Sequence, residues 1–221
     1  MSIRDNLIKL KGHLPEQVKL IAVSKTNPAE NIREAYDAGQ RVFGENRVQE
    51  ISDKQPQLPN DIEWHFIGHL QTNKVKYIAP FVALIHSIDS VKLLAEVNRE
   101  AIKNNRIIDC LLEMFIAMEE SKFGLDLNEA SALLDSPEYK RMENIRICGL
   151  MGMATFTENM EVVRKEFKTL RSYFGNLKGK YFNENPYFKE ISMGMSGDYP
   201  IAIEEGSTMI RIGTSIFGDR K

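Results

Sequence analysis

The sequence predicts an α/β fold, a single (β/α)8 barrel of the TIM type with an extra helix at its N-terminus. Short apolar runs of strand length recur eight times along the 221 residues, and polar segments with helical spacing separate most of them. Strands that alternate with helices form parallel sheets, and a chain of this length can close one barrel. A doubly wound open sheet is the alternative, but such a sheet rarely needs eight strands in so short a chain. We therefore expect one domain over residues 1–221.

The composition limits the class of protein. Apolar residues make up 43% of the chain, enough for a substantial core, and the formal net charge is −2 with no long basic run. Nucleic acid is therefore a poor candidate partner, and no apolar stretch is long enough to cross a membrane. Cys110 and Cys148 each lie in an apolar run, without the spacing of a redox pair or a disulfide framework. We expect reduced core thiols and a cytoplasmic protein.

The elements can be justified in chain order. Residues 1–14 carry Ile3, Leu7, Leu10 and Leu14 among charged residues, which is the spacing of an amphipathic helix and lacks the apolar centre of a signal peptide. The eight apolar runs that follow are expected to be buried strands. They span residues 20–24, 41–45, 62–67, 82–88, 108–116, 145–151, 190–194 and 208–213.

Helical patterns occupy the polar segments between these runs. In residues 27–40, Asn27 is a candidate N-cap, Pro28 suits the first helical position, and Gly39 suits the end of the helix. Longer amphipathic patterns span residues 90–105 and 158–175. Such helices are expected to cover the outside of the barrel.

In a barrel of this kind, functional groups lie at the carboxyl ends of the strands, and phosphate commonly binds after strands seven and eight. Lys25 directly follows the first run. A lysine there is either a solvated surface residue or an amine held at the barrel mouth to bond a carbonyl group.

After the last two runs, residues 191–198 and 211–218 mix glycine with Ser and Thr. Glycine lets backbone amides approach an anion, and hydroxyls add donors. Neither stretch matches a P-loop or dinucleotide fingerprint. Ordinary glycine turns are the alternative, but the position on loops seven and eight favours a phosphate site.

Arg211 lies within the last run, and strand alternation decides where it points. Met209, Arg211 and Gly213 share one face of the strand, whereas Ile210 and Ile212 share the other. The two isoleucines suit the side that packs on helices, so Arg211 is expected to point into the barrel. A buried cation needs a partner. The partner is either a structural carboxylate or an acceptor on a bound ligand.

These three features together indicate one ligand. An amine, a phosphate site and an inward arginine suit a molecule with an aldehyde, a phosphate and a ring acceptor, and pyridoxal 5′-phosphate has all three. Lys25 would form a Schiff base with the aldehyde, and Arg211 would face the pyridine nitrogen.

At this point the chain also resembles a known family, the pyridoxal-phosphate homeostasis proteins, whose barrel is like the N-terminal barrel of alanine racemase. The matching stretches appear in family order and span nearly the whole chain. They are AVSKT (22–26), FGENRVQE (43–50), WHFIGHLQTNK (64–74), GLMGMAT (149–155), ISMGMSGD (191–198) and GSTMIRIGTSIFG (206–218).

The resemblance implies a barrel of the type III fold of pyridoxal-phosphate proteins and a set of cofactor-binding residues. That set is Lys25, Asn46, Ser192, Ser196, Arg211, Gly213 and Thr214. Lys25 would hold the cofactor covalently, Arg211 would lie at the ring nitrogen, and Asn46 would be a polar group near the cofactor. The four others would contact the phosphate.

The expected function is to hold pyridoxal phosphate and to buffer or deliver it. A cation at the ring nitrogen leaves that nitrogen unprotonated and the ring a weak electron sink, which disfavours decarboxylase or transaminase chemistry. Racemases of this type take a second base from another subunit's separate domain, and the chain ends shortly after the eighth run. We therefore expect a carrier without a catalytic residue, with enzymes that lack their cofactor as transient partners. The sequence shows no heptad seam, apolar patch or dimer domain, so a monomer is expected. The alternatives are a small amino-acid racemase and a lysine-dependent aldolase.

Other residues could carry chemistry. His65 and His69 have a metal-ligand spacing, but a glycine between them and the strand pattern break the geometry, so no metal site is expected. Glu45 and Glu50 are candidate acid/base groups, although Glu45 could equally be a structural partner of an arginine. Lys122 is either a loop charge or a second site for aldehyde attachment.

Overall fold

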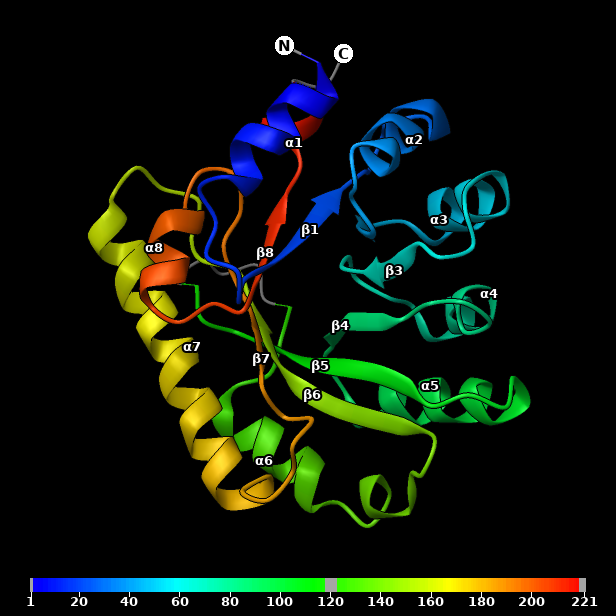
Figure 1. Cartoon of the computed structure of the whole chain (residues 1–221). Helices are drawn as coiled ribbons and strands as arrows, with labels where there is room; N and C mark the ends of the chain where they lie inside the picture. Colours follow the sequence, from blue (N-terminus) through cyan, green and yellow to red (C-terminus); the bar gives the residue numbers. More distant parts are fainter. Residues whose placement is uncertain (1, 118–122, 219–221) are drawn as a thin grey trace.

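The computed structural model describes residues 2–117 and 123–218, and these form a closed barrel of eight parallel strands (Figure 1). Neighbours in the barrel are neighbours in the chain, and β1 pairs with β8 to close it. The expected fold is confirmed. The strands are β1 (Lys19–Val23), β2 (Val42–Glu45), β3 (Glu63–Phe66), β4 (Leu84–Ile88), β5 (Ile108–Met114), β6 (Ile145–Gly152), β7 (Glu190–Ser192) and β8 (Met209–Ile212).

Helices surround the strands, as Figure 1 shows. The expected N-terminal helix is present and packs beside the last helix, where the side-chain amide of Asn6 donates to the carbonyl of Ile216 at 3.0 Å. The helices are α1 (Ile3–Lys11), α2 (Ala29–Asp37), α3 (Val48–Lys54), α4 (Val75–Ile78), α5 (Val91–Lys103), α6 (Leu127–Asp135), α7 (Met160–Tyr181), α8 (Tyr199–Glu204) and α9 (Thr214–Phe217), and the 3-10 turns are η1 (Gln55–Gln57), η2 (Thr72–Lys74) and η3 (Tyr139–Arg141).

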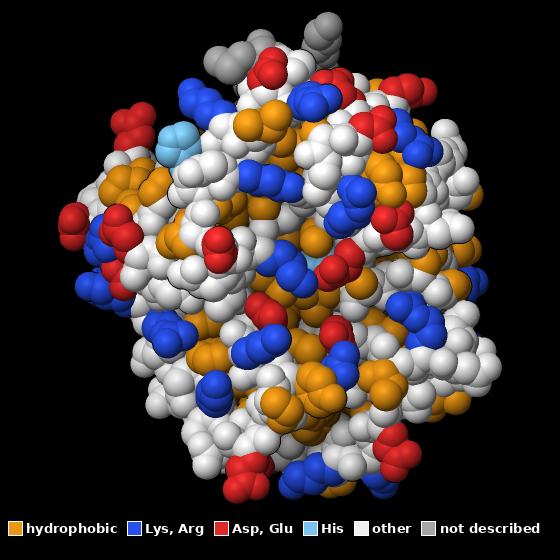
Figure 2. All heavy atoms as spheres, in the orientation of Figure 1, with side chains coloured by type: hydrophobic (Ala, Val, Ile, Leu, Met, Phe, Trp, Pro, Cys, Tyr) orange, Lys and Arg blue, Asp and Glu red, His pale blue; other side chains and the backbone are white. Residues whose placement is uncertain are grey.

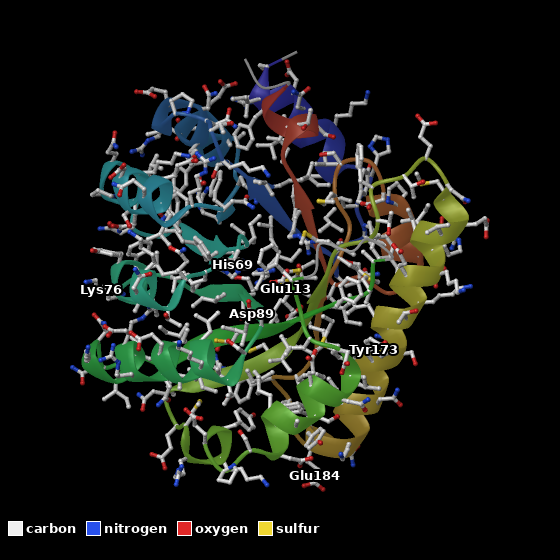
Figure 3. All side chains as sticks on the ribbon, turned by 180° about the vertical axis from the view of Figure 1, so that it is seen from behind. His69, Lys76, Asp89, Glu113, Tyr173 and Glu184 are labelled. Carbon is white, nitrogen blue, oxygen red and sulfur yellow. The ribbon has the colours of Figure 1, made fainter. Side chains whose placement is uncertain are left out.

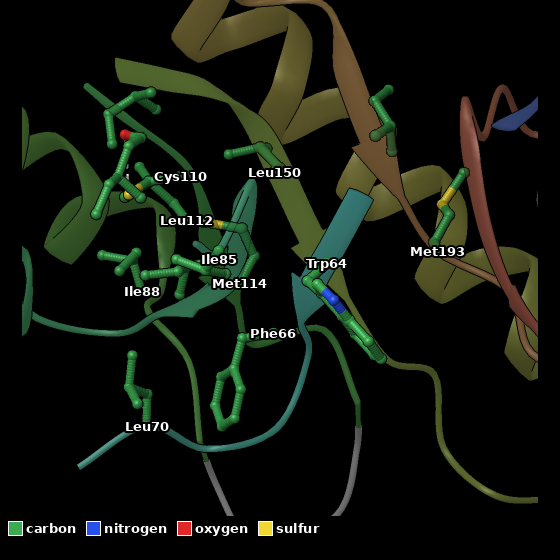
Figure 4. Packing of buried hydrophobic residues seen from close by; sticks show 14 of the residues in the cluster. Trp64, Phe66, Leu70, Ile85, Ile88, Cys110, Leu112, Met114, Leu150 and Met193 are labelled. Atoms are coloured by element: carbon green, nitrogen blue, oxygen red, sulfur yellow. Dashed lines mark hydrogen bonds between the residues drawn. The ribbon is translucent and has the colours of Figure 1, made fainter. Parts of the chain in front are cut away.

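The apolar residues form two clusters. The larger lies between the outer faces of the strands and the helices, and Figure 4 shows part of it, including Trp64 and Phe66. The smaller lies inside the barrel and includes Ile21, Leu111 and Met209. Because it is small, much of the barrel interior is left to polar side chains. Both cysteines are buried and free, as expected. No helix within residues 2–117 and 123–218 is long and apolar enough to cross a membrane.

The start of α2 differs from the prediction. The helix begins at Ala29, and Pro28 is the N-cap, with extended backbone and no side-chain capping bond. The expected capping role of Asn27 is therefore wrong. Its side-chain amide donates to the carbonyl of Lys25 at 3.3 Å, and its oxygen accepts from the side chain of Asn31 at 3.1 Å. The extended backbone at Pro28 moves Asn27 out of capping range and into the turn that carries Lys25.

Candidate functional site

A cavity of about 400 Å³ opens beyond the carboxyl ends of the strands. Loops that follow β1, β2, β6, β7 and β8 contribute to its wall. Six of the seven predicted site residues line it, and the seventh, Ser192, is not among the lining residues. The six are Lys25, Asn46, Ser196, Arg211, Gly213 and Thr214.

Arg211 enters the barrel interior from β8, as strand alternation predicts. Its guanidinium donates to the carbonyl and hydroxyl oxygens of Ser192 at 2.8 and 2.7 Å, and to the carbonyl of Gly152 at 3.1 Å. Burial lowers the pKa of Arg211 to about 10, although the acidic Asp198 and Glu113 oppose that effect. The group therefore stays charged at neutral pH, in a fixed orientation at the inner end of the cavity.

Ser192 lies behind Arg211 and belongs to a chain of hydrogen bonds through the barrel. Its hydroxyl lies 3.0 Å from Nδ1 of His86, and Nε2 of His86 lies 3.0 Å from Nδ1 of His65. Nε2 of His65 lies 2.9 Å from Glu63, whose carboxylate also binds Lys19 at 3.0 Å. If the hydroxyl of Ser192 donates to Nδ1 of His86, then Nε2 of His86 donates to His65 and Nε2 of His65 donates to Glu63. Every hydrogen bond from Arg211 to Glu63 then has one donor and one acceptor.

Burial keeps His65 and His86, the two histidines in this series of hydrogen bonds, neutral. It lowers the pKa of His65, although the hydrogen bond to Glu63 opposes this, and lowers that of His86 well below its usual range. Both rings are fully buried. His69, by contrast, is half-exposed and lies beside Asp89, with its Nδ1 3.6 Å from that carboxylate. The two histidines with metal-ligand spacing therefore point to different places.

The phosphate end of the predicted site combines free hydroxyl and amide donors. The hydroxyls of Ser196 and Thr214 donate to no protein acceptor within the described residues, and the amides of Ser196 and Gly197 are likewise unused there. The loop keeps its shape through Asp198, whose carboxylate accepts from the amide of Met195 at 2.5 Å. Donors held in a fixed loop and not paired with protein suit an anion.

Asn46 adds a second sign that the cavity is built for a polar ligand. Its Oδ1 is buried and has no hydrogen-bond partner within the described chain, although buried polar atoms usually have one. The loop after β2 passes close to Gly68, where a Cβ would lie 2.3 Å from the carbonyl oxygen of Asn46. Only glycine at position 68 therefore lets Asn46 occupy its place on the cavity wall.

Comparison with known proteins agrees with this geometry. Residues 1–221 match the family of the alanine racemase N-terminal domain. The pyridoxal phosphate homeostasis protein of Aquifex aeolicus is 46% identical over 205 residues, which cover 92% of this chain and 87% of that protein. The protein of the same name from Escherichia coli strain K12 is 39% identical, over 95% of this chain and 88% of that protein. The chain belongs to the pyridoxal phosphate homeostasis protein family.

The chain is also similar to a solved structure, that of PipY from Synechococcus elongatus with pyridoxal phosphate bound. It is 38% identical to this chain, has a TM-score of 0.89, and the match covers 98% of this chain and all of that one. The expected family and the expected barrel are therefore both confirmed.

The predicted set of site residues includes none from the loop between β6 and α7, which forms part of the wall. Met153, Thr155 and Phe156 of this loop line the cavity. A buried carboxylate on α7 anchors the loop, because Glu166 accepts from the amide and the hydroxyl of Thr155, each at 2.7 Å. A glutamate on the inner face of a long helix could have signalled this anchor.

Two of the other candidates do not line the cavity. Glu45 and Glu50 both pair with Lys54, at 2.8 and 2.9 Å, behind the turn that carries Lys25. Glu45 is thus a structural partner of a cation, but the expected arginine is wrong, because the partner is Lys54. Lys122, the candidate second attachment site, lies outside the described residues.

Glu113, on the inner face of β5, lies near Asp89 in the middle of the barrel mouth (Figure 3). Burial raises the pKa of Glu113 to about 7, with a further rise from Asp89 and an opposing effect of Arg211. Between pH 4.5 and about 7 the folded protein therefore keeps a proton on Glu113. In the unfolded chain the same carboxyl group has its ordinary pKa of 4.5 and has lost the proton in this range. Stability from this group is fully present below that ordinary value and is lost as the pH rises toward 7 and above.

We expect Glu113→Gln to remove this dependence. The ligand-free variant should gain stability relative to the wild type as the pH rises from about 5 to 8, by up to about 3 kcal/mol. Urea denaturation at a series of pH values measures the difference, and the absolute stability of the variant does not matter. Parallel pH curves for the two proteins would show that Glu113 is ionised throughout.

Proposed function

We propose that the protein binds pyridoxal 5′-phosphate in this cavity, with the cofactor attached to Lys25 as a Schiff base, and that it buffers or delivers the cofactor. The observation that carries the proposal is the meeting of Lys25, Arg211 and unpaired donors after β7 and β8 in one cavity. The relatives named for pyridoxal phosphate homeostasis and the cofactor bound in PipY support it.

The roles of the residues follow from their positions. Lys25 supplies the amine, and the loops with Ser196 and Thr214 supply donors for the phosphate. Asn46 has a buried oxygen without a partner and is a candidate acceptor for a polar group of the ligand. For Ser192 we propose a supporting role, because its hydroxyl binds Arg211 and His86.

When bound, pyridoxal phosphate supplies an aldehyde for amines and a ring that can accept electrons. Arg211 limits the second property. Its guanidinium cannot accept a proton, and a fixed positive charge disfavours a protonated ring nitrogen beside it. Its three hydrogen bonds to Ser192 and Gly152 hold that charge in place. This arrangement disfavours decarboxylase or transaminase chemistry on the bound cofactor, as expected of a carrier.

The test is to titrate the purified protein with pyridoxal phosphate, reduce with borohydride, and identify the modified peptide by mass spectrometry. We expect saturable binding and one modified residue, Lys25. Incubation with L-alanine should produce no appreciable D-alanine, and sugar phosphates should not be cleaved. Brisk racemisation by the wild type would overturn the carrier function, and turnover of a sugar phosphate without the cofactor would support an aldolase.

The phosphate donors give a sharper prediction. Thr214→Val removes one hydroxyl from the proposed phosphate site, and a hydrogen bond to a charged group contributes about 1.5–3 kcal/mol. We expect affinity for pyridoxal phosphate to fall about ten-fold to a hundred-fold, with little change for unphosphorylated pyridoxal. Isothermal titration with both ligands measures this, and Thr214→Ser, which keeps a hydroxyl, is the control. Equal losses for both ligands would place Thr214 away from the phosphate.

We also propose that the protein works as a monomer in the cytoplasm and meets apo-enzymes transiently. The free thiols of Cys110 and Cys148 suit a reducing compartment. Charged side chains of both signs are interspersed on the face drawn in Figure 2. Light scattering at low micromolar concentration should give the mass of one chain, 25.3 kDa. A stable dimer under those conditions would contradict the prediction and reopen the racemase alternative.

A further inference from the structure

We propose that Lys54, Glu45 and Glu50 form a buried clamp that holds the turn carrying Lys25 in a strained conformation, and so positions the amine. These are positioning residues, because each acts on Lys25 through Ser24 or Thr26, the residues on either side of it. The inference rests on the proposed role of Lys25, but the clamp itself can be tested without any ligand. It also gives a physical reason for the GENRVQE stretch, most of which does not reach the cavity.

Lys54 is the centre of the clamp. It is the last residue of α3, is only 8% exposed, and directs its amine toward the β1–α2 turn rather than toward solvent. Its Nζ donates to Oε1 of Glu45 at 2.8 Å, to Oε2 of Glu50 at 2.9 Å and to the carbonyl of Ser24 at 3.1 Å. An ammonium group has three donors, so these bonds use all of them.

The two carboxylates bind the residues on both sides of Lys25. Oε1 of Glu45, which is fully buried, accepts from the hydroxyl of Ser24 at 2.7 Å. Oε2 of Glu50 accepts from the backbone amide of Thr26 at 2.7 Å. The residue before Lys25 is thus held through its carbonyl and its hydroxyl, and the residue after it is held through its amide.

The backbone held in this way is strained. Thr26 has φ of 66°, in the left-handed region that a β-branched residue rarely adopts. Among the described non-glycine residues, Asn105 alone shares a positive φ, and asparagine tolerates that conformation well. Strain of this kind persists only where the surroundings impose it, and it is concentrated at functional sites. Here the bond from the Thr26 amide to Glu50 supplies the constraint.

A purely structural salt bridge is the competing explanation, and strain relief separates the two. Glu50→Ala should release the Thr26 amide and let the turn relax, so that Lys25 moves away from its attacking position. In the double variant Glu50→Ala/Thr26→Gly, glycine adopts the left-handed conformation without strain and should restore the turn. Loss of a salt bridge that only stabilises the fold would not be rescued by a change at Thr26.

The first measurement uses the ligand-free protein. Hydrogen exchange, followed by NMR, should show a protected Thr26 amide in the wild type and an unprotected one in Glu50→Ala. Asp53→Ala, which removes a neighbouring exposed carboxylate of α3, should leave the Thr26 amide protected. Unchanged protection in Glu50→Ala would overturn the clamp, whatever the cofactor results.

The second measurement separates positioning from binding. The rate of borohydride-trapped attachment of pyridoxal phosphate should fall about ten-fold to a hundred-fold in Glu50→Ala, since a small misplacement of a reacting group has effects of that size. Affinity for 4-deoxypyridoxine 5′-phosphate, which lacks the aldehyde, should be unchanged. Thr26→Gly should then recover most of the lost rate in the double variant.

The outcomes are distinguishable. Attachment at the wild-type rate in Glu50→Ala, or a slow rate that Thr26→Gly does not rescue, would overturn the positioning role. If the wild type itself attaches no cofactor, the proposed function fails, whereas the exchange of the Thr26 amide still decides whether the clamp exists. Lys54→Arg is the conservative companion: it keeps the charge but cannot reproduce three bonds from one nitrogen, so we expect an intermediate loss of rate.

Discussion

Replacing Lys25 by alanine is expected to abolish borohydride-stable attachment of pyridoxal phosphate while leaving the fold intact. Lys25 is half-buried in the turn after β1 and is the lysine that lines the cavity. A Schiff base needs a primary amine, and no other described lysine lies on that wall. Its removal leaves room in an open cavity, so the cost in stability should be small.

The measurement is intact-mass spectrometry after reduction, with the visible spectrum of the bound cofactor as a second readout. Lys76→Ala, which removes an exposed lysine of α4, is the control and should keep full attachment. Weaker, reversible binding should survive in Lys25→Ala through the phosphate donors and Arg211. Full attachment in the variant would show that another lysine holds the cofactor, and peptide mapping would then decide whether Lys122 does.

The periodicity of the sequence was enough to predict the barrel and all eight strands, because each strand is buried and each is followed by a polar segment or turn. Arg211 was predicted to point inward for the same reason, since Ile210 and Ile212 could only pack on helices. Small shifts at strand ends, such as the start of β4 at Leu84 instead of position 82, reflect local turns that periodicity does not resolve.

What could not be predicted depends on contacts between strands and on distant pairings. The resemblance implies that Ser192 contacts the phosphate, but it does not predict the bonds of its hydroxyl to Arg211 and His86, which follow from the register of β7 opposite Met209. Lys54 would ordinarily be assigned to a solvated helix end, and only the packed fold shows that it lies beneath the Lys25 turn. A buried lysine between two glutamates has no periodic signature.

The second large effect is expected at Arg211, and it decides between carrier and catalyst. Exchanging the guanidinium for a carboxylate reverses the charge beside the ring nitrogen, and an adjacent opposite charge changes a pKa by about 1–3. Arg211→Glu should therefore favour a protonated ring nitrogen and a stronger electron sink. We expect slow side reactions with L-alanine, seen as conversion of the cofactor to its pyridoxamine form, that the wild type does not show.

The variant must first fold, and its surroundings show the difficulty. Arg211 satisfies the carbonyls of Ser192 and Gly152, and Asp198 and Glu113 lie close enough to influence its pKa. A carboxylate there loses these hydrogen bonds and adds a like charge, so breaking this arrangement should cost about 3–5 kcal/mol. Arg211→Glu/Glu113→Gln removes one of the neighbouring acids and is the better protein for the test.

Arg211→Gln is the matched control, because it is neutral, can still donate to Ser192, and should bind cofactor through Lys25 and the phosphate donors. The wild type, Arg211→Gln and Arg211→Glu/Glu113→Gln are incubated with L-alanine, and D-alanine, the pyridoxamine form and the visible spectrum are followed together. A graded response, with the reversed charge the most reactive, would tie the inertness of the wild type to the charge at this position. If Arg211→Glu/Glu113→Gln matches the wild type in spectrum and reactivity, Arg211 does not face the ring, and the inertness of the carrier must come from another residue.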